Sequence, residues 1–236
     1  MKWRHIKAVF NKQFVDTAHN RSILIQFLAF PVMMVLLLLA MTDSMATGIT
    51  RGSIVTLMST VFTGLMPILT VYNIIREDKM YNTLRVLIMS TVKPLEYLIG
   101  ITSYILFVSL IIAFIFGLLG GLRGVWLLAY VGVLLLGTAV TLVFGSAMAM
   151  YSTRRGSAGS LITIVAMLNS MIPLLSIFSE PAQKFSKYLY TYQINNMLGD
   201  IYANYFGWNR LIIVFVNFII FFVLFMNAYK GNRFYE

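Results

Sequence analysis

The residue types that could do chemistry gather in one short segment between two long apolar stretches. Residues 76–79 are Arg-Glu-Asp-Lys, and Tyr81, Leu84 and Ile88 follow at a spacing that puts them on one helix face. Acidic residues in a first turn complement the helix dipole, and Pro94 disfavours helix before it. We therefore predict a short helix that docks its apolar face into a groove of another protein. A helix lying flat on a membrane surface is the alternative.

The rest of the chain lacks the groups that intramembrane enzymes use. Its six long charge-free stretches contain no histidine, and the two histidines are His5 and His19. Proton relays, acid proteases and metal hydrolases need ionisable groups at membrane depth. There is no cysteine and no G-x-x-x-x-G-K-[ST] phosphate loop. We expect no enzyme activity, metal or cofactor in this chain, so any nucleotide must be bound by a partner.

Composition indicates which elements must position these residues. The chain has 236 residues, of which 59% are apolar and 11% charged, against about 25% charged in soluble domains. Its mean hydropathy is +0.83. Continuous apolar runs of about 20 residues fit membrane helices, whereas barrel strands alternate. We predict one all-α polytopic membrane domain over residues 1–236, with spans at 23–41, 54–75, 98–119, 125–151, 157–178 and 211–229.

The distribution of basic residues predicts the orientation. With both termini inside, 13 of the 18 Lys and Arg residues lie in cytoplasmic segments, as the positive-inside rule requires. The net charge of +10 is then explained by topology and anionic lipid headgroups, and we expect no nucleic-acid partner. The absence of cysteine fits a multi-pass protein of a bacterial plasma membrane.

Two further segments lie outside the predicted spans. Residues 1–22 form an amphipathic helix on the inner membrane surface, either a simple anchor or a grip for a partner. Its apolar face is predicted to contain Trp3, Ile6, Phe10 and Phe14. Residues 179–210 form an outer loop rich in tyrosine and tryptophan, which favour the headgroup region. This loop either caps the exit of a pathway or is an inert aromatic belt.

Polar and small side chains inside the spans predict helix packing. Asn169 and Ser170, next to Pro173, form the most polar patch, and an asparagine at this depth either bonds a neighbouring helix or contacts a ligand. Small residues recur every four positions in the fourth span and predict a close helix–helix contact, within one chain or between two chains. They are Gly137, Thr141, Gly145 and Ala149.

Together these features resemble the permease subunits of type-2 ATP-binding cassette (ABC) exporters. The similarity covers the whole chain and is most specific in the segment after the second span. The residues that match there are Glu77, Thr83, Leu84, Leu87, Pro94 and Gly100. The resemblance implies that this segment is a coupling helix, that residues 1–22 are a connecting helix, and that two permeases pair as a homodimer or heterodimer. It also implies a separate ABC ATPase that binds ATP and Mg²⁺.

The resulting hypothesis is an export permease driven by that ATPase. The residues expected to couple the two proteins are Glu77, Asp78, Thr83, Leu84, Leu87 and Ile88. The cargo path is expected to involve the second and fifth spans, with candidates Thr63, Met66, Thr70, Asn169 and Met171. A charge-free path favours an amphipathic or hydrophobic peptide, drug or lipid-like cargo. The alternative is a membrane scaffold or accessory subunit that transports nothing.

Overall fold

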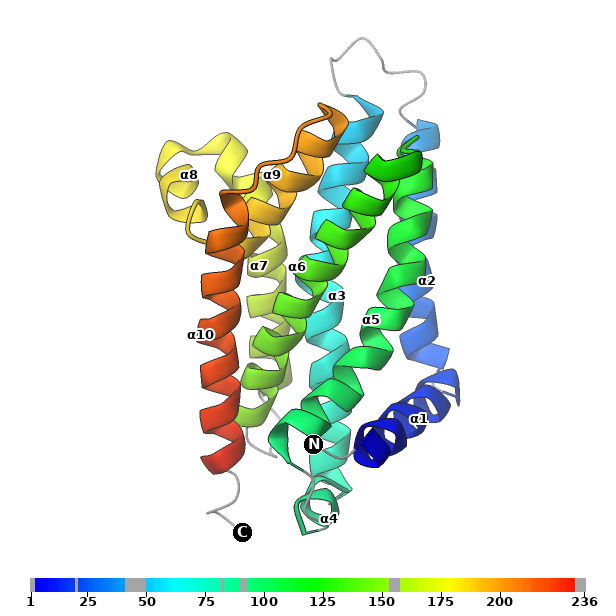
Figure 1. The fold of residues 1–236 in the computed structure, drawn as a ribbon, viewed down its shortest axis with the longest axis vertical. Helices are drawn as coiled ribbons and strands as arrows, with labels where there is room; N and C mark the ends of the chain where they lie inside the picture. The colour runs from blue at the N-terminus through cyan, green and yellow to red at the C-terminus, as the bar shows by residue number, and fades with distance from the viewer. Residues whose placement is uncertain are drawn as a thin grey trace.

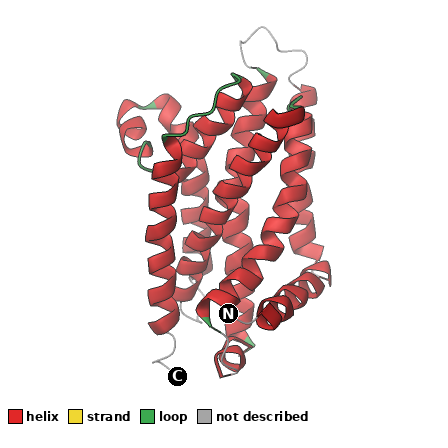
Figure 2. Ribbon diagram, viewed as in Figure 1, coloured by secondary structure: helices red, strands yellow, loops and turns green. Residues whose placement is uncertain are grey.

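The chain folds into a bundle of helices. The computed structural model describes residues 3–19, 21–40, 50–81, 83–89, 93–152 and 158–231, and all regular structure in these segments is helical (Figure 2). In chain order the helices are α1 Trp3–His19, α2 Arg21–Ala40, α3 Arg51–Met80, α4 Thr83–Met89, α5 Pro94–Leu119, α6 Gly124–Tyr151, α7 Ala158–Phe178, α8 Glu180–Ser186, α9 Tyr190–Tyr202 and α10 Arg210–Gly231. The predicted all-α fold is confirmed.

Five helices in the described segments are long and apolar enough to cross a membrane, namely α3, α5, α6, α7 and α10. They match the last five predicted spans to within a few residues at most ends. The predicted first span falls on α2, where the apolar portion is the shorter stretch Phe27–Ala40. The protein is therefore a multi-pass, all-helical membrane protein with five candidate spans.

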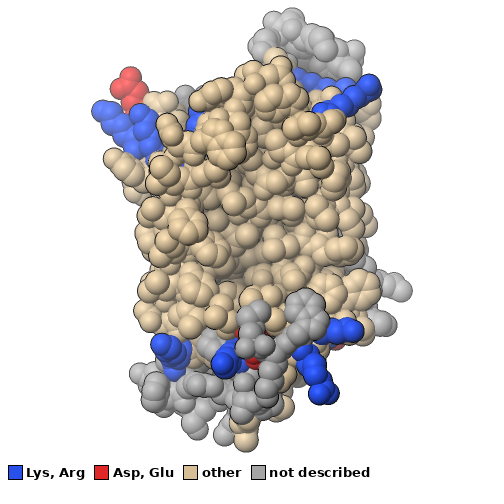
Figure 3. All heavy atoms as spheres, in the orientation of Figure 1, with Lys and Arg blue, Asp and Glu red and all other residues tan. Residues whose placement is uncertain are grey.

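The surface supports a membrane position. Figure 3 shows Lys and Arg at the two ends of the visible face, with a wide band between them that lacks charged residues. One end, which we call the α4 end, carries α1, α4 and the last turns of α3 and α10 (Figure 1). The opposite end, the α8 end, carries α8 and the first turn of α10 (Figure 1). A charge-free band between two charged rims is the pattern expected of a bilayer-spanning protein.

Helix α3 forms the centre of the bundle and packs against α2, α5, α6, α7 and α9. The small residues of α6 allow its close approach. A methyl group at Gly145 would lie 2.9 Å from the Ile68 Cα, and one at Gly137 would lie 2.9 Å from the Thr63 Cγ2. The predicted small-residue stripe therefore mediates contact within one chain, because its four members are all buried against neighbouring helices.

One predicted boundary is wrong. The segment beginning at Arg76 was expected to start a new helix, with Glu77 and Asp78 in its first turn, but both acids lie in the last turn of α3. At 30 residues, α3 is about 45 Å long and extends beyond a bilayer core of about 30 Å. Polar residues that are good helix formers continue the helix into water, and the separate helix α4 begins only at Thr83.

The predicted outer loop is mostly helical. Residues 180–186 form α8 and residues 190–202 form α9, which packs against α3, α6, α7 and α10. Tyr190 was expected at the headgroup region, but it is 1% exposed inside the bundle. Tyr188, Tyr205 and Trp208 remain exposed, and both roles proposed for this segment, an exit cap and an aromatic belt, stay predictions. Helical periodicity explains the difference, since α9 turns one face inward and the other outward.

Candidate functional site

The connection between α3 and α5 projects from the α4 end of the bundle (Figure 1). Met80, Tyr81, Val86 and Met89 expose more than half of their surface there, whereas Leu87 is half-buried and packs on the core. Met80 and Tyr81 lie at the end of α3, and Val86 and Met89 lie on α4. Apolar side chains exposed together at one end of a bundle are typical of a docking surface. We call these four exposed residues the apolar tip. The side chains of Leu84 and Ile88 lie outside the described part of the structure, so their predicted roles remain predictions.

Asp78 ties this connection to two other helices. Its side chain is 3% exposed; one oxygen accepts a hydrogen bond from the Lys12 Nζ of α1, and the other accepts one from the Tyr97 hydroxyl of α5, at 2.8 Å. A buried carboxylate needs such partners because its desolvation is otherwise costly. Asp78 was predicted to contact an ATPase; the structure instead places it inside the chain, whereas neighbouring Glu77 is exposed.

Lys79 links the same turn of α3 to α6. Its buried Nζ donates hydrogen bonds to the carbonyl oxygens of Ala149, Met150 and Ser152, at 2.9, 2.8 and 3.0 Å. The last carbonyls of a helix lack partners within the helix and carry a partial negative charge. A lysine ammonium satisfies both requirements, so α3 and α6 are joined at their ends.

Helix α1 is attached to α5 by a second polar contact and by close packing. The His5 Nδ1 lies 2.8 Å from the buried carboxylate of Glu96, which also accepts a hydrogen bond from the Lys93 amide at 3.2 Å. A methyl group at Gly100 would lie 2.6 Å from the Val9 Cβ, so only a glycine permits this approach. These contacts hold α1 along α5.

The predicted apolar face of α1 is largely the face that packs on α5. Ile6 is buried, and the rings of Phe10 and Phe14 meet the Tyr104 ring edge-on at centroid distances of 6.1 and 6.0 Å. Phe14 is half exposed, and the side chain of Trp3 lies outside the described part. The amphipathic pattern therefore reflects helix packing, and a position at the membrane interface remains a prediction.

The residues predicted to line a cargo path do not share one open surface. Thr63, Met66, Thr70 and Asn169 are buried inside the chain, whereas Met171 is 37% exposed on α7. The Thr63 hydroxyl donates to the Ser59 carbonyl one helical turn earlier, at 2.8 Å. These side chains pack the interior of a single chain, and their predicted role in transport is untested.

Asn169 belongs to a buried cluster of hydrogen bonds that connects four helices. Its amide donates to the Gly64 carbonyl of α3 at 3.0 Å and to the Tyr190 hydroxyl of α9 at 2.7 Å. The hydroxyls of Tyr190 and Thr141 of α6 are 2.9 Å apart. Burial raises the pKa of Tyr190 to about 12, so its hydroxyl stays neutral at physiological pH. Of the two alternatives for Asn169, the interhelical bond is the one observed.

Several residues that make the polar contacts of Asp78, Lys79 and Asn169 were not predicted from the sequence. Lys12, Lys79 and Tyr97 lie in segments that were predicted to be cytoplasmic, and no such contact was expected of them; Tyr190 was assigned to an outer loop. Only one of these contacts had a signal in the sequence, and it was weak. Lys79 follows Asp78 at the end of a long apolar run, where a lysine can donate hydrogen bonds to the last carbonyl groups of a helix.

No protein-family model matches the chain, and no curated protein sequence is significantly similar to it. The fold therefore defines the class, a multi-pass helical membrane protein, and the activity must be argued from geometry. Two features carry that argument: an exposed apolar tip at one end, and polar contacts that connect the base of this tip to α1, α5 and α6.

Proposed function

We propose that the chain is the membrane-spanning permease subunit of a type-2 ABC exporter. The observation that carries the proposal is the apolar tip on the α3–α4 segment, which projects from the bundle with no described neighbour over most of its surface. An apolar tip of this kind suits a groove on a soluble partner, and the chain has no phosphate loop of its own. The partner is thus an ATPase that supplies the energy.

The polar contacts at the base of the tip provide a route for that energy. Switching a pathway from almost entirely inward to almost entirely outward takes about 5.5 kcal/mol of differential binding. Such energy is transmitted only through stiff contacts, and Asp78 and Lys79 join the last turn of α3 to three other helices. A push on α4 therefore displaces α1, α3, α5 and α6 together.

The remaining parts of the proposal concern topology and assembly. Helix α2 is the sixth span, and the α4 end with both termini faces the cytoplasm of a bacterial plasma membrane. Two permeases pair, and the cargo path lies between them because Thr63 and Asn169 are packed inside one chain. The path carries an amphipathic or hydrophobic peptide, drug or lipid-like molecule. Membrane lipids are the other partners.

Site-specific crosslinking tests the docking. A photoreactive phenylalanine analogue replaces Val86, which is 63% exposed on α4, and a control variant carries it at Val125, which is 77% exposed in the first turn of α6. Irradiation of native membranes should crosslink position 86, and not position 125, to a protein that contains a phosphate loop. Mass spectrometry identifies the product. Failure to capture any such ATPase at position 86 contradicts the proposal.

A reconstitution separates transport from a scaffold role. The chain and the captured ATPase are placed together in vesicles, and ATP turnover is measured with and without candidate amphipathic cargo. Cargo-stimulated turnover supports an exporter. Binding of the ATPase without any stimulation supports the scaffold alternative, and cargo movement by the chain alone without nucleotide excludes an ABC permease.

A further inference from the structure

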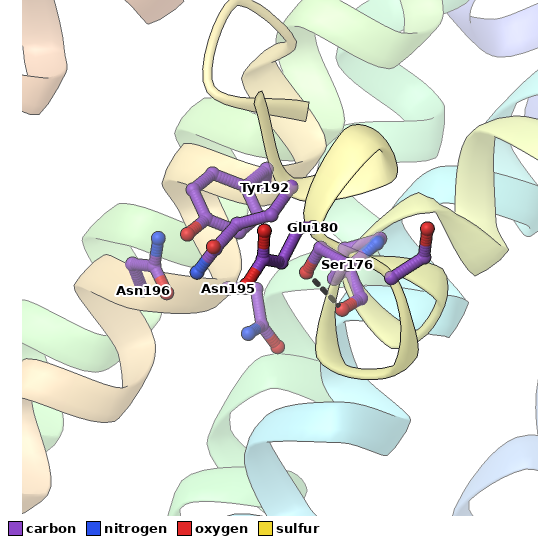
Figure 4. Close-up of a pocket in the computed structure, with 8 residues that line it drawn as sticks. Ser176, Glu180, Tyr192, Asn195 and Asn196 are labelled. Atoms are coloured by element: carbon purple, nitrogen blue, oxygen red, sulfur yellow. Dashed lines mark hydrogen bonds between the residues drawn. The ribbon is translucent and has the colours of Figure 1, made fainter. Parts of the chain in front are cut away.

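A polar cavity of about 320 Å³ lies at the α8 end, between the last turn of α7, the short helix α8 and the first turns of α9. Figure 4 shows the Glu180 carboxylate between the Tyr192 ring and Ser176. Asn195 and Asn196 complete the side of the cavity formed by α9. Its volume falls at the lower end of the range for small-molecule sites, about 300–1,000 Å³.

The lining is rich in hydrogen-bond acceptors and lacks cations. No Lys, Arg or His is among its residues, although the chain carries a net charge of +10. Among the described residues, the side chains of Glu180, Tyr192 and Asn196 make no hydrogen bond or ion pair with protein. These groups are available to a ligand and otherwise contact water.

The floor of the cavity is fixed to the bundle. The Asn195 side-chain oxygen accepts a hydrogen bond from the Thr60 hydroxyl of α3 at 3.1 Å, and the buried Ser176 hydroxyl donates to the Pro173 carbonyl at 2.6 Å. The Asn195 and Ser176 side chains are therefore held in place by interactions that do not depend on a ligand. A preformed cavity loses less entropy on binding than one that must be ordered.

We propose that this cavity binds a primary ammonium group. Glu180 supplies the opposite charge, the Tyr192 ring offers a face to the cation, and the asparagine and serine oxygens accept the N–H donors. The group belongs either to a lipid headgroup or to a free amine. The inference concerns a site in the chain itself and does not depend on transport.

Ethanolamine and ethylene glycol test the charge requirement, since they have nearly the same size and differ in the ammonium. The full chain is placed in phosphatidylcholine nanodiscs, and binding is measured by saturation-transfer NMR. Ethanolamine should bind at least about tenfold more tightly than ethylene glycol. Equal binding of the two compounds overturns the proposal.

Substitutions test how much Glu180 and Tyr192 contribute to ethanolamine binding. Glu180→Gln should weaken ethanolamine binding about tenfold or more, and Tyr192→Leu about threefold through loss of the cation–ring contact. Asp16→Asn is the matched control, because it removes an exposed acid at the α4 end. Circular dichroism and size-exclusion chromatography verify folding. Unchanged ethanolamine affinity in a folded Glu180→Gln variant also overturns the proposal.

A competition experiment with lipids identifies the source of the ammonium group. Phosphatidylethanolamine is added to the nanodiscs, with phosphatidylglycerol as a control. Displacement of ethanolamine by phosphatidylethanolamine alone assigns the site to a lipid headgroup. Undiminished binding of ethanolamine in both lipids assigns it to a free amine, and either result supports the ammonium site.

Discussion

The rim of the bundle and its interior are held together by different chemistry. At the α4 end the contacts are charged: Lys12 with Asp78, His5 with Glu96, and Lys79 with the carbonyls that end α6. Toward the α8 end, α9 is held inside the bundle by neutral groups, chiefly Tyr190 with Asn169, and near the surface by an ion pair between its Asp200 and Arg210 of α10 at 2.8 Å. Charged contacts need water or strong partners, so they sit at the rim, whereas neutral contacts are tolerated at membrane depth.

In the proposed permease, this difference separates a part that receives force from the ATPase from a part that resists it. Asp78 and Lys79 occupy one helical turn beside the apolar tip, so any movement of the tip reaches three helices at once. Tyr190 connects α7, α6 and α9 far from any exposed apolar tip. We therefore expect substitutions at the α4 end to affect coupling and substitutions around Tyr190 to affect only stability.

The largest effect is expected from Leu84→Asp. Leu84 belongs to the docking face predicted from the sequence, and a charge there should reduce permease-dependent stimulation of ATP turnover at least about tenfold, because buried apolar anchors dominate interface energies. The reconstituted chain and its captured ATPase provide the measurement. Tyr205→Asp at the α8 end is the matched control and should leave stimulation unchanged. Normal stimulation of ATP turnover in Leu84→Asp contradicts the claim that the α4 end couples the chain to the ATPase.

Asp78→Ala is expected to detach α1. Removing one partner of a largely buried ion pair costs about 3 kcal/mol, somewhat less here because Lys12 is 36% exposed and recovers hydration. Thermal unfolding in detergent measures the loss, and limited proteolysis reports the release of α1. Glu77→Ala removes the adjacent, exposed acid and should change the free energy of unfolding by less than about 0.5 kcal/mol. Equal effects at the two positions argue against the contact between Asp78 and Lys12 as an attachment of α1.

Gly145→Val tests the packing of α6 on α3. The added side chain meets the Ile68 backbone, which cannot rotate away. We therefore expect the free energy of unfolding to fall by about 2–3 kcal/mol. Gly132→Val on the same helix is the control, since nothing lies within 4 Å of that position. Thermal unfolding of both variants decides the matter. If Gly132→Val is as harmful as Gly145→Val or more so, the close contact between Gly145 and α3 is not what limits substitution on α6.

The smallest effect is expected from Tyr190→Phe. The substitution removes a hydroxyl bonded to Asn169 and Thr141 and should cost about 1–2 kcal/mol, while Asn169 keeps its bond to the Gly64 carbonyl. Tyr188→Phe, at an exposed position, should be neutral. Stimulated ATP turnover should be unchanged in both. A loss of turnover in Tyr190→Phe would make this region part of the moving machinery.

Local patterns predicted some of these features and missed others for identifiable reasons. The apolar runs predicted α3, α5, α6, α7 and α10, because the length and purity of such a run depend only on neighbouring residues. The same approach misplaced Asp78, since a carboxylate at the end of an apolar run looks exposed until α1 supplies Lys12. It also missed Tyr190, because aromatic residues favour both headgroups and protein interiors.

The amino-acid sequence alone determined that the chain is a helical membrane protein and which segments cross the bilayer most readily. It also determined that a short segment with apolar side chains follows the span that forms α3. Tertiary structure decided which charges pair, where α1 and α9 pack, and that the stripe of α6 faces α3. Hydrophobicity and helical period are properties of a segment taken alone. Among the described residues, hydrogen-bonded side chains are separated by as many as 135 positions, as in Thr60 and Asn195, and only the folded arrangement of helices brings them together.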